Sequence, residues 1–147
     1  MTKEHPQWFQ SWFDTPYYHI LYKHRDYQEA EVFIKNIVTY LNFDKDDSIL
    51  DLACGKGRHS IFLNSLGYKV TGLDLSKNSI GYAKKHESNS LSFEVHDMRN
   101  TYKIQFEVVL NLFTSFGYFE DEEDNYKVIK TIKSSLKQNG IGVIDYM

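Results

Sequence analysis

The sequence predicts an α/β domain built on a mostly parallel sheet of about five strands. Three observations lead to this prediction. Short apolar runs, typical of strands covered on both faces, alternate along the chain with segments of helical spacing. Alternation of this kind implies right-handed crossovers between parallel strands. The chain has 147 residues, 41% of them hydrophobic and 25% charged, which is enough for one domain with a buried core.

In the first half of the chain, apolar residues at helical spacing predict a helix over 27–41. The run SILDLA, residues 48–53, is short and apolar, which predicts a strand. Helical spacing resumes after the CGKG segment and continues to Gly67. A second strand is predicted over 68–74.

In the second half, Ser76 is a favourable N-cap for a helix that runs to about Lys85. A further helix is predicted over 121–138, because acids in its first turn and lysine near its end suit the helix dipole. Asn139 and Gly140 are predicted to stop that helix. The remaining apolar runs predict strands over 91–96, 106–112 and 141–147.

Residues 1–26 differ in character from the rest of the chain, because aromatic side chains crowd them. We expect a short helical segment here, separate from the domain at 27–147. Two interpretations remain open: these aromatic residues pack on the domain, or they cover a site.

The first candidate site is the segment DLACGKG, which follows the first predicted strand. Glycines let the backbone turn tightly and let a ligand approach, and the free N–H groups of the next helix attract acceptor atoms. Ser60 stands where a nicotinamide or flavin site has its third glycine. Asp51, four residues before Gly55, would repel a phosphate and attract an ammonium group. We therefore expect a ligand with a positively charged amino group; a plain strand-to-helix turn is the alternative.

Two more acids stand at the carboxyl ends of predicted strands. Asp74 ends the second strand, and an acid at this place can accept both hydroxyls of a ribose. Asp97 follows the third strand and can accept from an exocyclic adenine amine, with Met98 beside the ring. Because such strand ends meet along one crevice, we expect Asp51, Asp74 and Asp97 to line the same site.

These segments resemble the motifs of class I S-adenosylmethionine-dependent methyltransferases of the small-molecule type. ILDLACGKG is similar to their glycine motif, VTGLDLS to their acidic second-strand motif and EVHDMRN to their adenine-side motif. The resemblance covers about residues 27–147. It implies a Rossmann-like three-layer sandwich with strand order 3-2-1-4-5 and an N-terminal helical lid over 1–26.

The same resemblance implies that a helix and two strands follow the fifth strand in this family. We therefore expect a truncated domain that lacks the C-terminal strands and is an inactive or weakly active fragment. An open fifth strand exposes unpaired backbone groups, which favours a homodimer through that edge.

The cofactor implied by the resemblance is S-adenosyl-L-methionine, and the product is S-adenosyl-L-homocysteine. Asp51 and the glycine loop would hold the methionine moiety, Asp74 the ribose and Asp97 the adenine. Ala53 stands where many members have glycine, and we expect alanine to be tolerated because it is small. The cofactor-binding residues implied are Arg25, Asp51, Ala53, Gly55, Gly57, Asp74, Leu75, Asp97, Met98 and Asn111.

On the acceptor side, similarity to small-molecule N-methyltransferases places Tyr18 or Tyr22 near the sulfonium as positioning candidates. The implied substrate-pocket residues are Phe113, Phe116 and Tyr118. Methyl transfer needs a general base only when the nucleophile arrives protonated, so no catalytic residue is assigned. No metal is expected. The weak candidates for a base are His19, His24, His59 and His96.

The expected reaction is methyl transfer to nitrogen or oxygen of a small molecule. The alternatives are an RNA or protein methyltransferase, a non-catalytic S-adenosylmethionine-binding module and, more distantly, a nicotinamide oxidoreductase. A net charge of −3 and the lack of an Asn/Asp-Pro-Pro-aromatic segment disfavour DNA as a partner. A single cysteine, Cys54, permits no internal disulfide and favours a cytoplasmic location. No apolar window is long enough to predict a membrane span.

Overall fold

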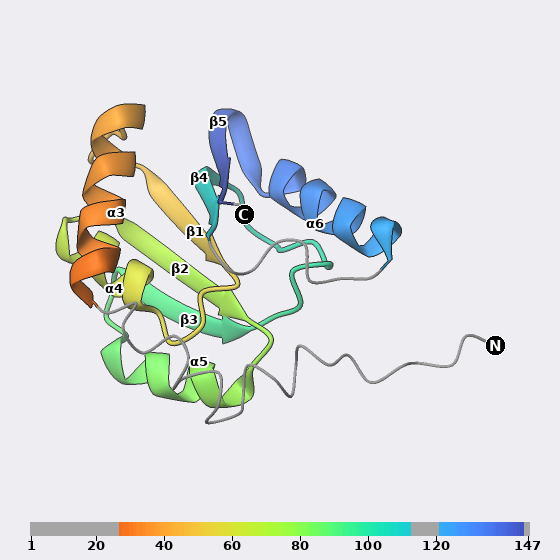
Figure 1. Ribbon diagram of the computed structural model, residues 1–147, viewed down its shortest axis with the longest axis horizontal. Coiled ribbons are helices and arrows are strands. Elements are labelled where there is room, and N and C mark those ends of the chain that lie inside the picture. The colour runs from red at the N-terminus through yellow and green to blue at the C-terminus, as the bar shows by residue number, and fades with distance from the viewer. Residues whose placement is uncertain (1–26, 113–120, 146–147) are drawn as a thin grey trace.

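The computed structural model describes residues 27–112 and 121–145, and its centre is a parallel sheet of five strands with helices on both faces (Figure 1). The strand order is β3-β2-β1-β4-β5, which confirms the predicted fold class and order. The strands are β1 (Ser48–Leu52), β2 (Lys69–Asp74), β3 (Leu91–Val95), β4 (Phe106–Asn111) and β5 (Leu136–Ile144). The helices are α3 (Tyr27–Leu41), α4 (Arg58–Ser65), α5 (Lys77–Ala83), the short 3-10 helix η1 (Lys84–His86) and α6 (Glu122–Ser134).

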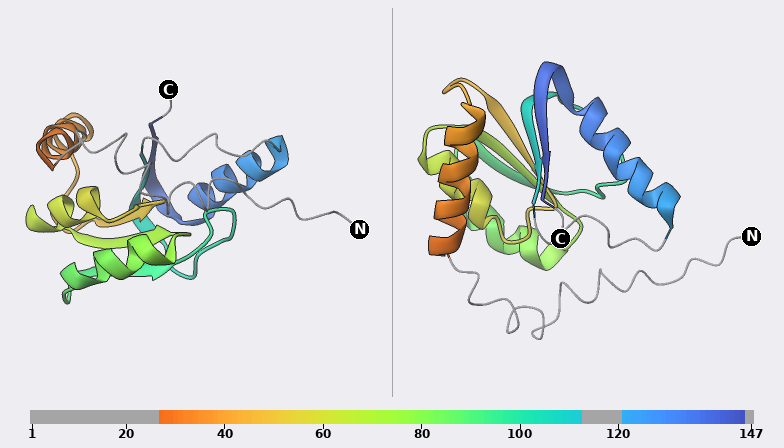
Figure 2. Two further views of the ribbon diagram at one scale, coloured as in Figure 1. Left: turned by 60° about the horizontal axis from the view of Figure 1, so that its bottom comes forward. Right: turned by 45° about the horizontal axis from the view of Figure 1, so that its top comes forward.

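The helices form two layers, one on each side of the sheet. Figure 2 shows α3, α4 and α5 on one side and α6 on the other. Ile34, Leu63 and Ile80 bring the first three helices into one buried core. Val128 and Ile132 of α6 belong to a second core on the opposite face. The sheet is therefore the middle layer of a three-layer sandwich, as predicted.

The central strands are apolar because both of their faces are covered by helices or by loop. In β1 every residue from Ile49 to Leu52 is buried. Two polar side chains interrupt this pattern: Asp51 is 1% exposed and Asn111 is 0% exposed. Buried polar side chains need hydrogen-bond partners. Asp51 and Asn111 therefore mark the part of the sheet where polar contacts replace apolar packing.

Residues 96–105 carry the chain from β3 across the sheet to β4 as a loop. Tyr102 of this loop stacks on Phe106, with ring centroids 6.3 Å apart. Met98 and Tyr102 pack against the second core, so the crossing runs on the α6 side of the sheet. This path brings the residues after β3 close to α6.

The N-cap predicted for α5 agrees with the structure, but the predicted end of α6 does not. The Ser76 side chain caps α5 by accepting the Ser79 N–H at 3.1 Å, as predicted. The helix predicted over 121–138 ends at Ser134, because the Ser135 carbonyl already accepts the Phe106 N–H of β4 at 2.7 Å.

Asn139 and Gly140 do not stop the helix; they lie in an irregularity of β5. Leu136 pairs with Phe106 while Ile141 pairs with Val108, so extra residues are accommodated on the β5 side. Asn139 has a φ of 63°, and a Cβ on Gly140 would lie 2.9 Å from the Lys137 carbonyl oxygen. The prediction was correct that these residues break regular structure, but wrong about the element they break.

Candidate functional site

The site predicted from the sequence lies at the carboxyl edge of the sheet, near the point between β1 and β4 where the strand order reverses. Strand β1 pairs with β2 on one side and with β4 on the other. The helices that follow β1 and β4 in the chain, α4 and α6, lie on opposite faces of the sheet, and open α/β sheets bind ligands at such a point.

The two glycines of the loop after β1 have different roles. Gly55 has a φ of +58°, and a Cβ there would meet no atom within 4 Å, so its backbone faces open space. Gly57 has a φ of +86°, and a Cβ there would lie 2.7 Å from the ring of Phe93 on β3. Gly57 therefore serves the packing of the loop on the sheet, whereas Gly55 leaves room for a ligand.

Ala53, in the same loop, has a φ of 62°, which L-residues with a Cβ rarely adopt. The small size of alanine alone predicts that it is tolerated here. The structure shows a different constraint: glycine suits this position because of backbone conformation, and alanine holds the loop under strain.

Asp51 is the most deeply buried acid of the site. Its Oδ2 accepts the Ser60 hydroxyl of α4 at 2.6 Å. Burial, with a smaller contribution from the negative charge of Asp74, raises the pKa of Asp51 to about 7, although Ser60 and Arg58 oppose this shift. A cation bound beside Asp51 would favour its charged form.

Asp74 connects the glycine loop to the start of α5. Its Oδ2 accepts the Gly55 N–H at 2.8 Å and its Oδ1 accepts the Ser76 N–H at 2.8 Å. Asp74 is thus held in a fixed orientation at the carboxyl end of β2.

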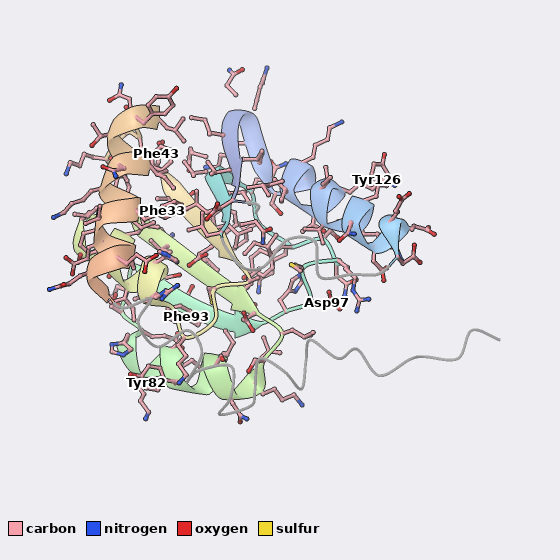
Figure 3. All side chains as sticks on the ribbon, viewed as in Figure 1. Phe33, Phe43, Tyr82, Phe93, Asp97 and Tyr126 are labelled. Carbon is pink, nitrogen blue, oxygen red and sulfur yellow. The ribbon has the colours of Figure 1, made fainter. Side chains whose placement is uncertain are left out.

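Asp97 lies in the loop after β3, on the side of the sheet nearer α6 (Figure 3). Arg99 approaches it with its Nη2 at 2.7 Å and its Nε at 3.1 Å, and the Arg99 N–H donates to it at 2.9 Å. Burial alone would raise the pKa of Asp97, but these contacts outweigh burial and hold it below the usual value. Arg99 is not among the site residues predicted from the sequence, although a cation two residues after the acid is a signal that could have identified it.

Asn111, at the end of β4, faces the α6 side, whereas Asp51 faces α4. Its Nδ2 donates to the Leu52 carbonyl at 3.0 Å and lies 4.0 Å from the Met98 sulfur. Its Oδ1 is buried and has no hydrogen-bond partner among the described residues. The structure thus places Asn111 beside Met98 of the loop after β3.

The other predicted site residues divide into two groups. Leu75 and Met98 pack partly buried against the second core. The lid and pocket candidates lie outside the described residues: Tyr18, Tyr22, Arg25, Phe113, Phe116 and Tyr118, together with His19 and His24.

The two described histidine candidates differ in environment. His59 packs on Phe33 of α3 with ring centroids 6.0 Å apart, and burial with the Arg58 charge lowers its pKa to about 3. A group with so low a pKa is a weak general base near neutral pH. His96 donates from Nε2 to the Asn100 carbonyl at 2.8 Å.

The chemistry of these groups fits the cofactor that the resemblance implies. Asp51 suits an ammonium group, the open backbone at Gly55 leaves room for a ligand chain, and Asp74 can accept from hydroxyls. Asn111 Oδ1, which has no donor among the residues that the structure describes, has the capacity to accept a hydrogen bond. Within the described ranges, no group of three or more histidine, cysteine, aspartate or glutamate side chains could hold a metal ion.

Comparison with known proteins agrees with this geometry. Residues 49–140 match the methyltransferase domain family. The putative methyltransferase YqeM of Bacillus subtilis is 37% identical over 101 residues, which cover 66% of this chain and 41% of the relative. A glycine/sarcosine N-methyltransferase of Aphanothece halophytica is 32% identical over 127 residues, which cover 82% of this chain and 46% of the relative.

A solved structure extends the similarity to the fold. The S-adenosylmethionine-dependent methyltransferase of Clostridium acetobutylicum superposes with a TM-score of 0.73 and 25% identity, over 91% of this chain and 56% of that protein. The chain spans less than half the length of the two curated relatives above. The predicted resemblance is confirmed: the chain belongs to the methyltransferase domain family, with the Rossmann-like fold of its class I S-adenosylmethionine-dependent members.

Proposed function

We propose that this chain binds S-adenosyl-L-methionine at the carboxyl edge of β1 and β2 and serves the transfer of its methyl group to nitrogen or oxygen of a small molecule. The observation that carries the proposal is the buried Asp51 next to the open backbone of Gly55. Burial makes the charged carboxylate unfavourable in the free protein even with hydrogen bonds from the Ser60 hydroxyl and the Ser60 N–H, and an ammonium group would relieve this cost.

We assign the following roles to five of the described site residues. Asp51 binds the amino group of the methionine moiety, and Asp74, held by two backbone N–H groups, accepts the ribose hydroxyls. Asp97 accepts the adenine amine, and Met98 with Leu75 provides apolar contact. The bound cofactor supplies a methyl group already activated on a positively charged sulfur. The protein then needs mainly to orient donor and acceptor, which favours catalysis by positioning.

The names of several relatives favour a small nitrogen nucleophile. One relative, 27% identical over 100 residues, is a Streptomyces venezuelae N,N-dimethyltransferase of a dTDP-linked amino sugar. The Aphanothece relative is named for glycine and sarcosine. Tyr18, Tyr22 and Arg25 as lid residues, and Phe113, Phe116 and Tyr118 as pocket residues, remain part of the proposal.

Ligand binding tests the cofactor first. S-adenosylmethionine and S-adenosylhomocysteine should raise the melting temperature, and NAD should not, because a ligand stabilises the state that it binds. Asp74→Ala should lower the affinity for S-adenosylhomocysteine by roughly ten- to 150-fold in calorimetry, because charge-assisted hydrogen bonds to the ribose are lost. Asp46→Ala, an exposed acid before β1, is the matched control and should keep the affinity. Equal affinities of Asp74→Ala and the natural protein would contradict the ribose assignment.

The acceptor class needs a separate measurement. Release of S-adenosylhomocysteine should be followed with small amines and alcohols, and in parallel with RNA and protein. Tight, salt-dependent RNA binding at physiological ionic strength would overturn the small-molecule assignment.

None of the described helices is long and apolar enough to span a membrane. We also propose that the protein is cytoplasmic and that DNA is not its partner.

The proposal includes self-association through β5, which lies at one edge of the sheet. Ile144 on this strand is 40% exposed, and an edge strand is a template for pairing with another chain. Light scattering should show a dimer, and Ile144→Lys should weaken its association. A monomer at all protein concentrations would contradict self-association through β5.

A further inference from the structure

Ser60 is a buried serine whose hydroxyl binds the acid at the carboxyl end of β1. It is the third residue of α4 and is 0% exposed, and Asp51 is 1% exposed. The Ser60 hydroxyl donates to Asp51 Oδ2 at 2.6 Å, and the Ser60 N–H is a second donor to the same carboxylate. Because bulk water does not hydrate so deeply buried a carboxylate, the charged form of Asp51 depends on these donors.

The start of α4 brings this hydroxyl to Asp51. The N-cap of the helix is Gly57, which has a φ of 86° and no side chain to accept from the first turn. Ser60 stands at the position where a nicotinamide site has its third glycine. A glycine there would have no hydroxyl to donate. The residue that departs from the nicotinamide pattern is therefore the one that holds the acid.

Other titratable groups also act on Asp51. Asp74 of β2 disfavours its charge, and Arg58 of α4 favours it. Burial raises the pKa of the Cys54 thiol well above its usual value, so the thiol beside the site is neutral. The neighbours of Asp51 in the sheet are a glycine of β2 and a leucine of β4, which do not titrate. Burial outweighs the bonds from Ser60 and raises the pKa of Asp51 to about 7, so its charge is finely balanced near neutral pH.

We propose that Ser60 is a positioning residue that keeps Asp51 charged and oriented for the ammonium group of the cofactor. The inference rests on the proposed function, because it requires the amino group of S-adenosylmethionine to reach Asp51. Ser60 itself does not need to touch the ligand. At acidic pH the proton on Asp51 must leave to solvent before the ammonium group binds, so loss of the hydroxyl weakens binding most where Asp51 is protonated.

The experiment follows the affinity for S-adenosylhomocysteine by calorimetry from about pH 6 to 9. In the natural protein the affinity should fall about tenfold for each pH unit below about 7, because one proton must be released. Ser60→Ala should move this profile to higher pH by about one unit or more, since a hydrogen bond to a charge is lost. The variant should then bind roughly tenfold more weakly at about pH 6 and within about twofold of the natural protein at about pH 9. Titration of the ligand's own amino group is common to both proteins and cancels in this ratio.

Three matched measurements separate this role from a general effect on folding. Ser60→Thr keeps the hydroxyl and should keep the natural profile, while Ser60→Cys, with a weaker donor, should move it to higher pH. Ser79→Ala removes another buried serine, which is the third residue of α5, and should leave the profile unchanged. Methylthioadenosine lacks the amino-acid part of the cofactor, so the natural protein and Ser60→Ala should bind it equally at each pH.

The outcomes distinguish the inference from the function on which it rests. A loss of affinity that is the same at every pH is the result expected of a serine that only shapes the start of α4, and it overturns the role of Ser60. No loss at any pH, or an equal loss for methylthioadenosine, overturns it as well. Failure of the natural protein to bind S-adenosylhomocysteine overturns the proposed function, and this inference with it.

Discussion

Two carboxylates at opposite ends of the β1–β4 pair have environments that shift their pKa values in opposite directions. At the amino end, Glu107 accepts the Ser48 N–H at 2.7 Å, the Ser48 hydroxyl and the Lys137 ammonium at 2.7 Å. Burial opposes its charge, but these donors outweigh burial and lower the pKa of Glu107 to about 2. At the carboxyl end, Asp51 accepts the Ser60 hydroxyl at 2.6 Å and the Ser60 N–H, but burial outweighs both and raises its pKa to about 7.

This difference favours the carboxyl end of the sheet as the place where a ligand binds. Glu107 is charged and satisfied, so it holds β1, β4 and the irregular start of β5 together. Asp51 is buried and under-compensated, so the fold is less stable than it would be with a neutral residue there. Perturbed acids of this kind are concentrated at ligand sites, because the ligand supplies the missing interaction.

The largest effect should come from removing the charge of Asp51. At about pH 8, Asp51→Asn should raise the free energy of unfolding by up to roughly 4 kcal/mol, because the shift from 3.8 to about 7 measures the penalty of the buried charge. The same variant should lose most of its affinity for S-adenosylhomocysteine. Urea unfolding and calorimetry measure the two effects, and an unchanged unfolding free energy would contradict the comparison.

The pH dependence of stability should be a second, smaller test. The contribution of Asp51 is complete below pH 3.8 and is lost as the pH rises through about 7. His59 acts in the opposite direction, because its contribution is complete above pH 6.5 and is lost as the pH falls toward about 3. The two slopes cancel between these limits, so the natural protein should show little change from this pair between about pH 5 and 6.5.

Asp51→Asn removes one of the two opposing slopes. Over the same interval its stability should therefore rise by roughly 2 kcal/mol, at 1.36 kcal/mol per pH unit. Glu107 and Asp97 titrate below this window, since their pKa values are lowered. Parallel profiles for the variant and the natural protein would show that Asp51 does not titrate as described.

The contrast also explains how far the sequence could predict the molecule. Local periodicity is sufficient for the first four strands but not for the start of β5, which lies inside the segment predicted as helix. The position of Asp51, Asp74 and Asp97 at strand ends is sufficient for their common edge. Ser60 was noticed only because it is not glycine, and its bond to Asp51 depends on how α4 packs. Contacts between distant residues, such as that of Glu107 with Lys137, leave no pattern in one sequence.

A smaller effect of opposite sign is expected at the amino end. Glu107→Gln should lower the free energy of unfolding by about 1 kcal/mol at neutral pH, because hydrogen bonds from Ser48 and Lys137 to a charge become bonds to an amide. The value is modest because Lys137 is 49% exposed and Glu107 is 33% exposed, where solvent screens the pair. Urea unfolding should show this loss, and Lys137→Met should reproduce part of it. A gain in stability would place Glu107 in the same class as Asp51.

The smallest expected effect concerns the backbone of the glycine loop. Ala53→Gly should raise the free energy of unfolding by roughly 0.5–1 kcal/mol, because a left-handed conformation costs alanine about 1–2 kcal/mol and glycine loses only part of that gain through unfolded-state entropy. Ala30→Gly in α3 is the matched control, and it should be destabilised by about 1 kcal/mol or more because Ala30 is helical and buried. Opposite signs for the two substitutions in urea unfolding would locate a second stability deficit at the carboxyl edge, beside Asp51. A loss in both variants would show that Ala53 packs well enough to offset its strain, and would leave the buried charge as the main deficit of that edge.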